Sequence, residues 1–276
     1  MLNSAAAVIR LTTHQLLGGR RRILTLVSWL LPVGVALLLR VLLPARAFAD
    51  SSVGYGSVLI GVYASILVPF VAVYWGSSVL TDEVEGKTLV YLWTRPAGRA
   101  RIMVMKFAVA LAWFMVLLLL SLTATYLTLA WGGEQPVRLH HLQTVLWDLR
   151  ALSLGGLTYA AVAFFLASLI RKPLMASLLY FYTIDFFLSW PIIPGYLKLL
   201  SVHHYVAVLS TRDAAPEADG PARFLGRALE KLVEETPTTE SQAVWTLVAA
   251  GLAFLIAGAL LTRSREFLGD DSARNQ

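Results

Sequence analysis

The chain has 276 residues, of which 57% are hydrophobic and only 14% charged, and its mean hydropathy is +0.67. Soluble domains carry about 25% charged residues, so the composition excludes a soluble globular protein and indicates a membrane protein. The chain has no cysteine, which excludes disulfides, zinc–thiolate sites and thiol catalysis. The net charge of +6 does not indicate nucleic-acid binding, because the basic residues are scattered between apolar runs.

Residues 1–22 are expected to form a cytoplasmic interfacial helix. Apolar and polar residues are mixed over residues 3–17, as in a helix that lies along a membrane surface. Arg20–Arg22, the apolar run that follows and Ala47-Phe48-Ala49 imitate a cleavable signal peptide. That run has about 21 residues, longer than the 7–15 of a signal peptide, so we predict an uncleaved first span.

Six apolar runs approach or exceed the roughly 20 residues with which a helix crosses a bilayer. None alternates like a barrel strand, so the sequence predicts an all-α membrane protein with a single transmembrane domain over residues 1–276. Lys and Arg gather before the first run, between the second and third, between the fourth and fifth, and after the sixth, which places both termini in the cytoplasm. The runs are 23–43, 57–80, 107–131, 151–170, 174–194 and 243–261.

The most charged of these loops, residues 80–107, has internal order. Asp82 with Glu85 three residues later resembles a capping box and predicts that a helix begins at Asp82. Acidic residues at the amino end and Arg95 after the carboxyl end agree with the helix dipole.

Leu89, Leu92 and Trp93 recur at helical spacing and form one apolar stripe, and Pro96 ends the element. The sequence thus predicts a short amphipathic helix outside the bilayer. One interpretation is a loop whose arginines satisfy the positive-inside rule and whose leucines touch lipid headgroups. The other is a docking helix whose apolar stripe fills a groove on a cytosolic partner.

The loop resembles the first cytoplasmic loop of ABC transporter permeases of the type-two, export-class family, which typically reads D-E-x-E-x-G-T-L-E-x-L-L-S-x-P-x-x-R followed by G-K. The six-span layout and the long external segment before the last span, residues 197–242, are also similar. Three positions depart from the pattern: Lys87 beside the Gly-Thr-Leu, Val84 and Met105. The residues expected to form the coupling helix are Asp82, Glu83, Glu85, Gly86, Thr88, Leu89, Leu92, Trp93, Pro96 and Arg99.

The resemblance implies a coupling helix that sits in a cleft of a separate ABC ATPase, with two permease chains and two ATPase chains in one transporter. The partners are then the ATPase, a second permease copy or homologue and the lipid bilayer, in the inner membrane of a prokaryote. This chain is expected to be no enzyme and to hold no cofactor, metal or nucleic acid. It lacks a G-x-x-x-x-G-K-[ST] loop, so ATP and Mg would be bound by the partner.

Two other functions compete with an ATP-driven exporter. A membrane scaffold would dock a cytosolic protein through residues 83–93 and need no ATPase. An intramembrane enzyme would be centred on Asp185 and the external histidines and need no partner. The sequence does not name a substrate.

Asp185 lies inside the fifth run, where insertion scales assign a cost of roughly 2.5–3.5 kcal/mol. A buried role that lines the intramembrane substrate path is one interpretation. The other is a structural hydrogen bond to the hydroxyls of the third run, at Ser121, Thr123 or Thr125.

Pro191 and Pro194 break the end of the fifth run, which predicts either a re-entrant segment or a simple span end with an aromatic belt. The external segment contains an amphipathic helix over residues 221–235. His140-His141 and His203-His204 are expected to be ordinary interfacial histidines, because adjacent side chains on a helix point in different directions.

Small residues on the fourth and sixth runs permit close helix packing, within the bundle or between subunits. They are Gly156, Ala160, Ala249, Ala253 and Ala257.

Overall fold

The computed structural model describes residues 2–42, 59–85, 99–130, 139–170, 172–188, 195–210 and 238–264. Every element in these ranges is a helix, as the all-α prediction requires. The elements are α1 (Leu2–Leu17), α2 (Gly19–Leu42), the π-helix η2 (Leu59–Leu67), α4 (Val68–Glu85), α6 (Arg99–Ala130), α7 (Leu139–Leu169), α8 (Pro173–Leu179), the π-helix η3 (Tyr180–Asp185), α9 (Phe186–Leu188), α10 (Gly195–Lys198), α11 (Val202–Ser210) and α13 (Glu240–Ser264).

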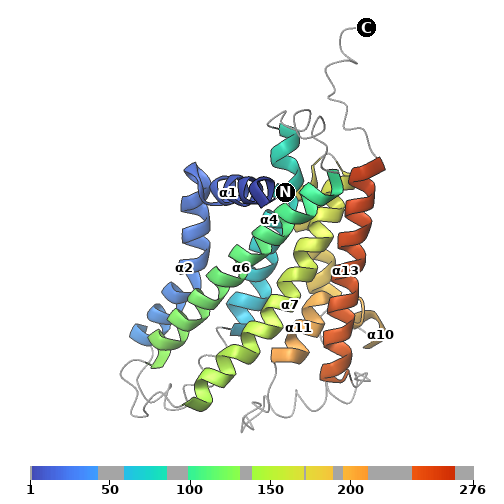
Figure 1. Ribbon diagram of the computed structural model, residues 1–276. Coiled ribbons are helices and arrows are strands. Elements are labelled where there is room, and N and C mark those ends of the chain that lie inside the picture. The colour runs from blue at the N-terminus through green and yellow to red at the C-terminus, as the bar shows by residue number, and fades with distance from the viewer. Residues whose placement is uncertain are drawn as a thin grey trace.

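The long helices run along one axis, with α1 lying across that axis at one end (Figure 1). The ends of α4 and α13 and the start of α6 lie at the same end of the bundle as α1. Five helices in the described ranges are long and apolar enough to cross a membrane. They are Thr25–Leu42, Gly61–Asp82, Arg101–Leu129, Val145–Leu169 and Glu240–Thr262.

The fifth predicted span is not confirmed as a continuous membrane crossing. Its described part is the helical run α8–η3–α9, which ends at Leu188 and changes from α to π geometry at Tyr180. Residues 189–194, including Pro191 and Pro194, lie outside the described ranges. The structure therefore supports five of the six predicted spans.

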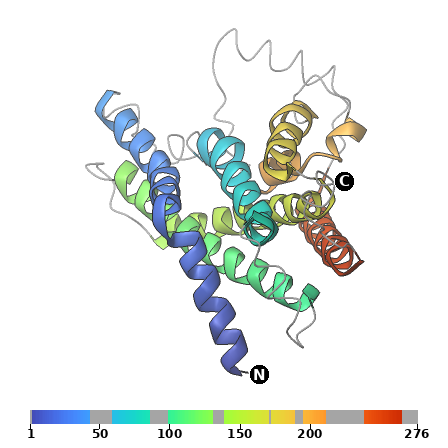
Figure 2. The same ribbon diagram turned by 90° about the horizontal axis from the view of Figure 1, so that it is seen from above.

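Helices α4 and α7 form the centre of the bundle. Within the membrane windows, 72% of the residues on each are buried, against 22% on α2 and 17% on α13, which lie at opposite edges (Figure 2). A Cβ atom built on Gly76 of α4 would lie 2.8 Å from the Ala160 Cα atom of α7, so these two backbones touch. The small pair predicted on the fourth run is thus used inside the bundle, with Gly156 under the Phe114 ring of α6.

Within the bundle, α13 does not pack through the alanine stripe predicted on the sixth run. Ala249 and Ala253 are exposed, whereas Gly251 and Gly258 are buried. A Cβ atom on Gly258 would lie 2.8 Å from the Phe164 ring, so the aromatic ring selects the side of α13 that has no side chain.

Helix α1 is attached to α6 by polar contacts; it ends at Leu17, and residues 19–22 of the predicted amino-terminal helix belong to α2. The Lys106 amine donates to the Gln15 amide oxygen at 2.9 Å, and the Trp113 indole donates to the Thr13 hydroxyl at 3.0 Å. The opposite side of α1 is exposed, including Leu11.

Three hydroxyls join α2 and η2 to α6 in one chain of hydrogen bonds. Ser121 donates to the Trp29 carbonyl at 2.7 Å, so it must accept from Tyr63, 2.7 Å away. The Tyr63 proton is then used, so Thr125 must donate to the Tyr63 oxygen at 2.8 Å. Each of the three hydroxyls donates one hydrogen bond, and Ser121 and Tyr63 also accept one, so the network is satisfied inside the apolar bundle.

Candidate functional site

The loop predicted to dock a partner, residues 86–98 and the residues on either side, connects the end of α4 to the start of α6. Asp82, Glu83 and Glu85 belong to the last turn of α4, which continues without a break from Val68. The prediction that a helix begins at Asp82 is therefore wrong. No glycine or proline stands between Leu80 and Glu85, so the spanning helix continues beyond its apolar run.

The acidic residues consequently lie at the carboxyl end of a helix rather than the amino end, where the dipole would favour them. Arg99 is the first residue of α6. The other predicted coupling residues lie outside the described ranges, and these are Gly86, Thr88, Leu89, Leu92, Trp93 and Pro96.

Lys106, near the start of α6, is only 2% exposed. Its burial is unexpected, because it lies in the charged stretch of residues 80–107. Its stem is buried in the bundle and its amine reaches Gln15 of α1. Lys106 thus connects α6, the helix that follows residues 86–98, to α1.

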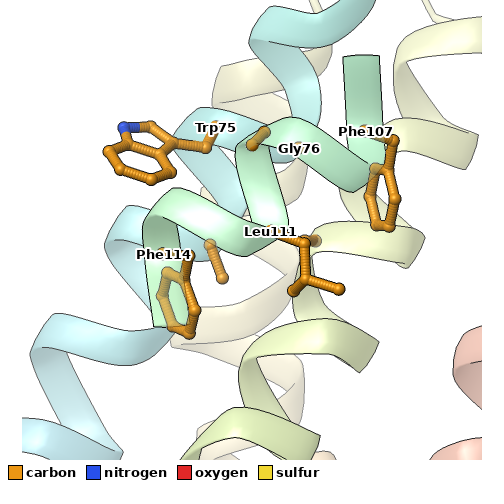
Figure 3. A pocket seen from close by; sticks show the side chains of 8 residues that line it. Trp75, Gly76, Phe107, Leu111 and Phe114 are labelled. Atoms are coloured by element: carbon orange, nitrogen blue, oxygen red, sulfur yellow. The ribbon is translucent and has the colours of Figure 1, made fainter. Parts of the chain in front are cut away.

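A small apolar pocket lies among α4, α6 and α7 (Figure 3). Trp75, Phe107 and Phe114 wall it with rings, and Gly76 lines it with backbone. The lining offers neither a titratable nor a polar side chain, so the pocket supports packing rather than chemistry. Its full lining is Ala72, Trp75, Gly76, Phe107, Ala110, Leu111, Phe114 and Ala160.

Asp185, at the end of η3, is 2% exposed and has neutral donors around its carboxylate. One oxygen, Oδ1, accepts from the Val202 N–H at 2.7 Å. The other, Oδ2, accepts from the Tyr159 hydroxyl at 2.9 Å and the His203 N–H at 3.3 Å. The Ser201 hydroxyl donates to the Asp185 carbonyl at 3.0 Å.

These contacts place Asp185 at the amino end of α11, which begins at Val202. A helix leaves its first N–H groups without partners, and they need acceptors when buried. Asp185 satisfies two of them from a separate segment of the chain, while the Ser201 hydroxyl accepts from the His204 N–H at 3.2 Å as an ordinary N-cap.

Helix α11 starts deep in the bundle. Tyr159 lies well inside the candidate span of α7, and the Val206 side chain sits directly over Gly155, one turn earlier on α7. Helix α11 therefore runs antiparallel to α7, away from the end that carries α1 (Figure 1). After the fifth run, the chain comes back at Val202 to the level of Tyr159 and Asp185. This path agrees with the re-entrant segment that was one of the two predictions from Pro191 and Pro194.

The hydroxyls expected to bind Asp185 are used elsewhere. Ser121 and Thr125 bind Tyr63, and Thr123 donates to the Leu119 carbonyl of its own helix. The sequence missed Tyr159 and Ser201, which do bind Asp185. Only Ser201 could have been identified from the sequence, because serine is a preferred N-cap residue and an apolar stretch of helical length follows it directly.

The two histidines of α11 point to different partners. The His203 ring hydrogen-bonds the Ala64 backbone in η2, and the His204 ring lies 3.5 Å from the Thr238 hydroxyl. Within the described ranges, no group of three His, Asp or Glu side chains is placed to hold a metal ion. His140 and His141 lie in the first turn of α7, and residues 221–235 are outside the described ranges.

A comparison with protein families matches residues 20–187 to the family described as ABC-2 family transporter protein. The chain belongs to this family. It is thus a permease of the ABC-2 type, the multi-pass membrane subunit of an ABC transporter. The match begins in α2 and includes the docking loop and Asp185, while α10, α11 and α13 lie beyond it. A search of curated proteins found no match.

Proposed function

We propose that this ABC-2 permease belongs to an ATP-driven exporter and couples ATP hydrolysis by a separate ABC ATPase to substrate movement. Its membership in the permease family carries the proposal. ATP and Mg²⁺ bind to the ATPase, two permease chains form the transmembrane part, and the substrate path lies at their interface. The export direction rests on the resemblance of the loop to the export-class pattern.

The position of the docking loop supports this coupling. Residues 86–98 connect the end of α4 to the start of α6, at the end of the bundle where α1 lies. The Gly76–Ala160 contact fixes α4 against α7, and α7 holds α11 through Tyr159 and Asp185. A partner that displaced the loop would move α4 and α7 together, because packed helices shift as rigid bodies.

The same end of the bundle is proposed to face the cytoplasm of a prokaryote. Both α1 and the carboxyl end of α13 lie there, and the loops at this end carry most of the Lys and Arg residues.

Copurification from the native host tests the proposal. The tagged protein is purified in mild detergent, its partners are identified, and ATPase activity is compared with that of a Leu89→Asp, Leu92→Asp double variant. Leu11→Asp is the matched control, because it places a carboxylate on the exposed side of α1 at the same end of the bundle.

We expect a stoichiometric nucleotide-binding subunit that is lost with the double change and kept with the control. A protein that copurifies without ATPase activity, or an ATPase unaffected by the double change, would favour the scaffold function instead.

A further inference from the structure

The amino end of α11 is a local positive charge inside the membrane bundle. A helix amino terminus carries about half an elementary charge, concentrated on its first N–H groups. The first two N–H groups of α11 both point at the Asp185 carboxylate. The third partner is the hydroxyl of Tyr159, whose ring is fully buried and packs edge-on against Phe181 at 4.6 Å.

We propose that Asp185 is a positioning residue whose negative charge anchors the amino end of α11 within the bundle. Helix α11 then occupies the space between η2, α7 and α13 in the half of the bundle opposite α1. This role differs from lining a substrate path, because the carboxylate is buried against its own chain. The inference does not depend on the ATP coupling proposed above.

The donor pattern explains why charge is needed as well as hydrogen bonding. Tyr159, Val202 and His203 all present hydrogens to Asp185, and a carboxylate accepts at both of its oxygens. An asparagine would turn an NH₂ group toward one of these donors and leave that donor unpaired. No water replaces the missing partner in the hydrocarbon region, so a buried unpaired N–H is costly there.

Anchoring of α11 also adds tertiary hydrogen bonds to η2. The His203 ring hydrogen-bonds Ala64, and the Tyr182 hydroxyl donates to the Ile66 carbonyl at 2.8 Å. Both acceptors belong to the π-helix, and both donors come from the two elements that meet at Asp185. A displaced α11 would therefore withdraw His203 from η2.

Cysteine labelling tests the proposal directly, because the chain contains no cysteine of its own. A single cysteine at Val208 reports on α11, and one at Val244 serves as the matched control on α13. Both positions are half-buried. The purified full-length protein is reconstituted into vesicles, and the rate of reaction with a membrane-impermeant maleimide is measured at each site.

We expect Asp185→Asn to raise labelling at position 208 about tenfold or more, since hydrogen bonds to a charged group are about twice as strong as neutral ones. Labelling at position 244 should not change. Asp185→Glu keeps the charge and should label more slowly than Asp185→Asn. An Asp185→Asn protein that labels like the wild type, or one that labels equally faster at both positions, would overturn the proposal.

Val202→Pro is a second variant that avoids replacing the buried carboxylate. It deletes the N–H that donates to Oδ1, at the first helical position, where proline is well tolerated. We expect labelling at position 208 to rise a few-fold, because one donor of the anchor is lost. An unchanged rate would contradict the anchoring role even if Asp185→Asn failed to fold.

Discussion

Replacing Gly76 by alanine tests the central contact of the bundle. The added Cβ atom would lie 2.8 Å from the Ala160 Cα atom and 2.9 Å from its carbonyl carbon, with the carbonyl oxygen closer still. These are backbone atoms of a helix and cannot rotate away. Helices α4 and α7 would have to separate by roughly half an ångström or more to restore van der Waals contact.

Overpacking of this kind costs about 1–3 kcal/mol. Alanine gains about 0.5–1 kcal/mol over glycine within a helix, which offsets only part of that cost. We therefore expect Gly76→Ala to lower the free energy of unfolding by about 1–2 kcal/mol. Gly34→Ala is the matched control, because nothing lies within 4 Å of a Cβ atom on Gly34 and only the helical gain applies.

Unfolding in lipid discs, followed by intrinsic tryptophan fluorescence, measures both variants against the wild type. The eight tryptophans provide the signal. A Gly76→Ala protein as stable as the Gly34→Ala protein would refute the backbone contact between α4 and α7.

Three further substitutions have defined outcomes. Tyr63→Phe removes the middle hydroxyl of the Ser121–Tyr63–Thr125 chain. In the same unfolding assay it should lower the free energy of unfolding by about 0.6 kcal/mol for each of the two lost bonds, with roughly 1.7 kcal/mol as the upper limit for one bond. Unchanged stability would contradict this hydrogen-bond chain. Lys106→Met removes the donor to Gln15 and should increase hydrogen exchange in α1 while leaving α13 unchanged, and equal protection of α1 would argue against that attachment. Gly156→Ala brings a Cβ atom to 2.5 Å from the Phe114 ring, which can turn aside, so its stability loss should be smaller than that of Gly76→Ala. An equal or larger loss would show that the ring is fixed.

Composition and local pattern were sufficient for the membrane class and for most helices. An apolar run of spanning length has few alternatives in lipid, so the first four runs and the last one became helices. The mixed composition of residues 3–17 likewise indicated a helix, and the structure has α1 there.

Helix boundaries near Asp82 could not be predicted from the same local information. The spacing of Asp82 and Glu85 signals a helix start only when the preceding residues are not already helical. Here the preceding residues form the spanning helix α4, which continues through both acids.

The partners of Asp185 depended on tertiary structure. The hydroxyls predicted on the third run could bind a carboxylate, but Ser121 and Thr125 bind Tyr63 instead. Tyr159 looks like an ordinary aromatic residue of a span until the bundle places it beside η3. The packing face of α13 also depended on tertiary structure. The Phe164 ring packs against Gly258, and the four-residue spacing of the alanines did not indicate that side of the helix.

The π-helix η2 has a consequence for how the chain is made. The Tyr182 hydroxyl that donates to the Ile66 carbonyl lies 116 residues later in the chain, and His203, which contacts Ala64, lies later still. A ribosome delivers the second span to the translocon long before either donor has been synthesised. The η2 half of this span therefore gains its tertiary contacts late, once α11 has docked, and a nascent chain released before that point lacks the contacts that hold η2 in the bundle.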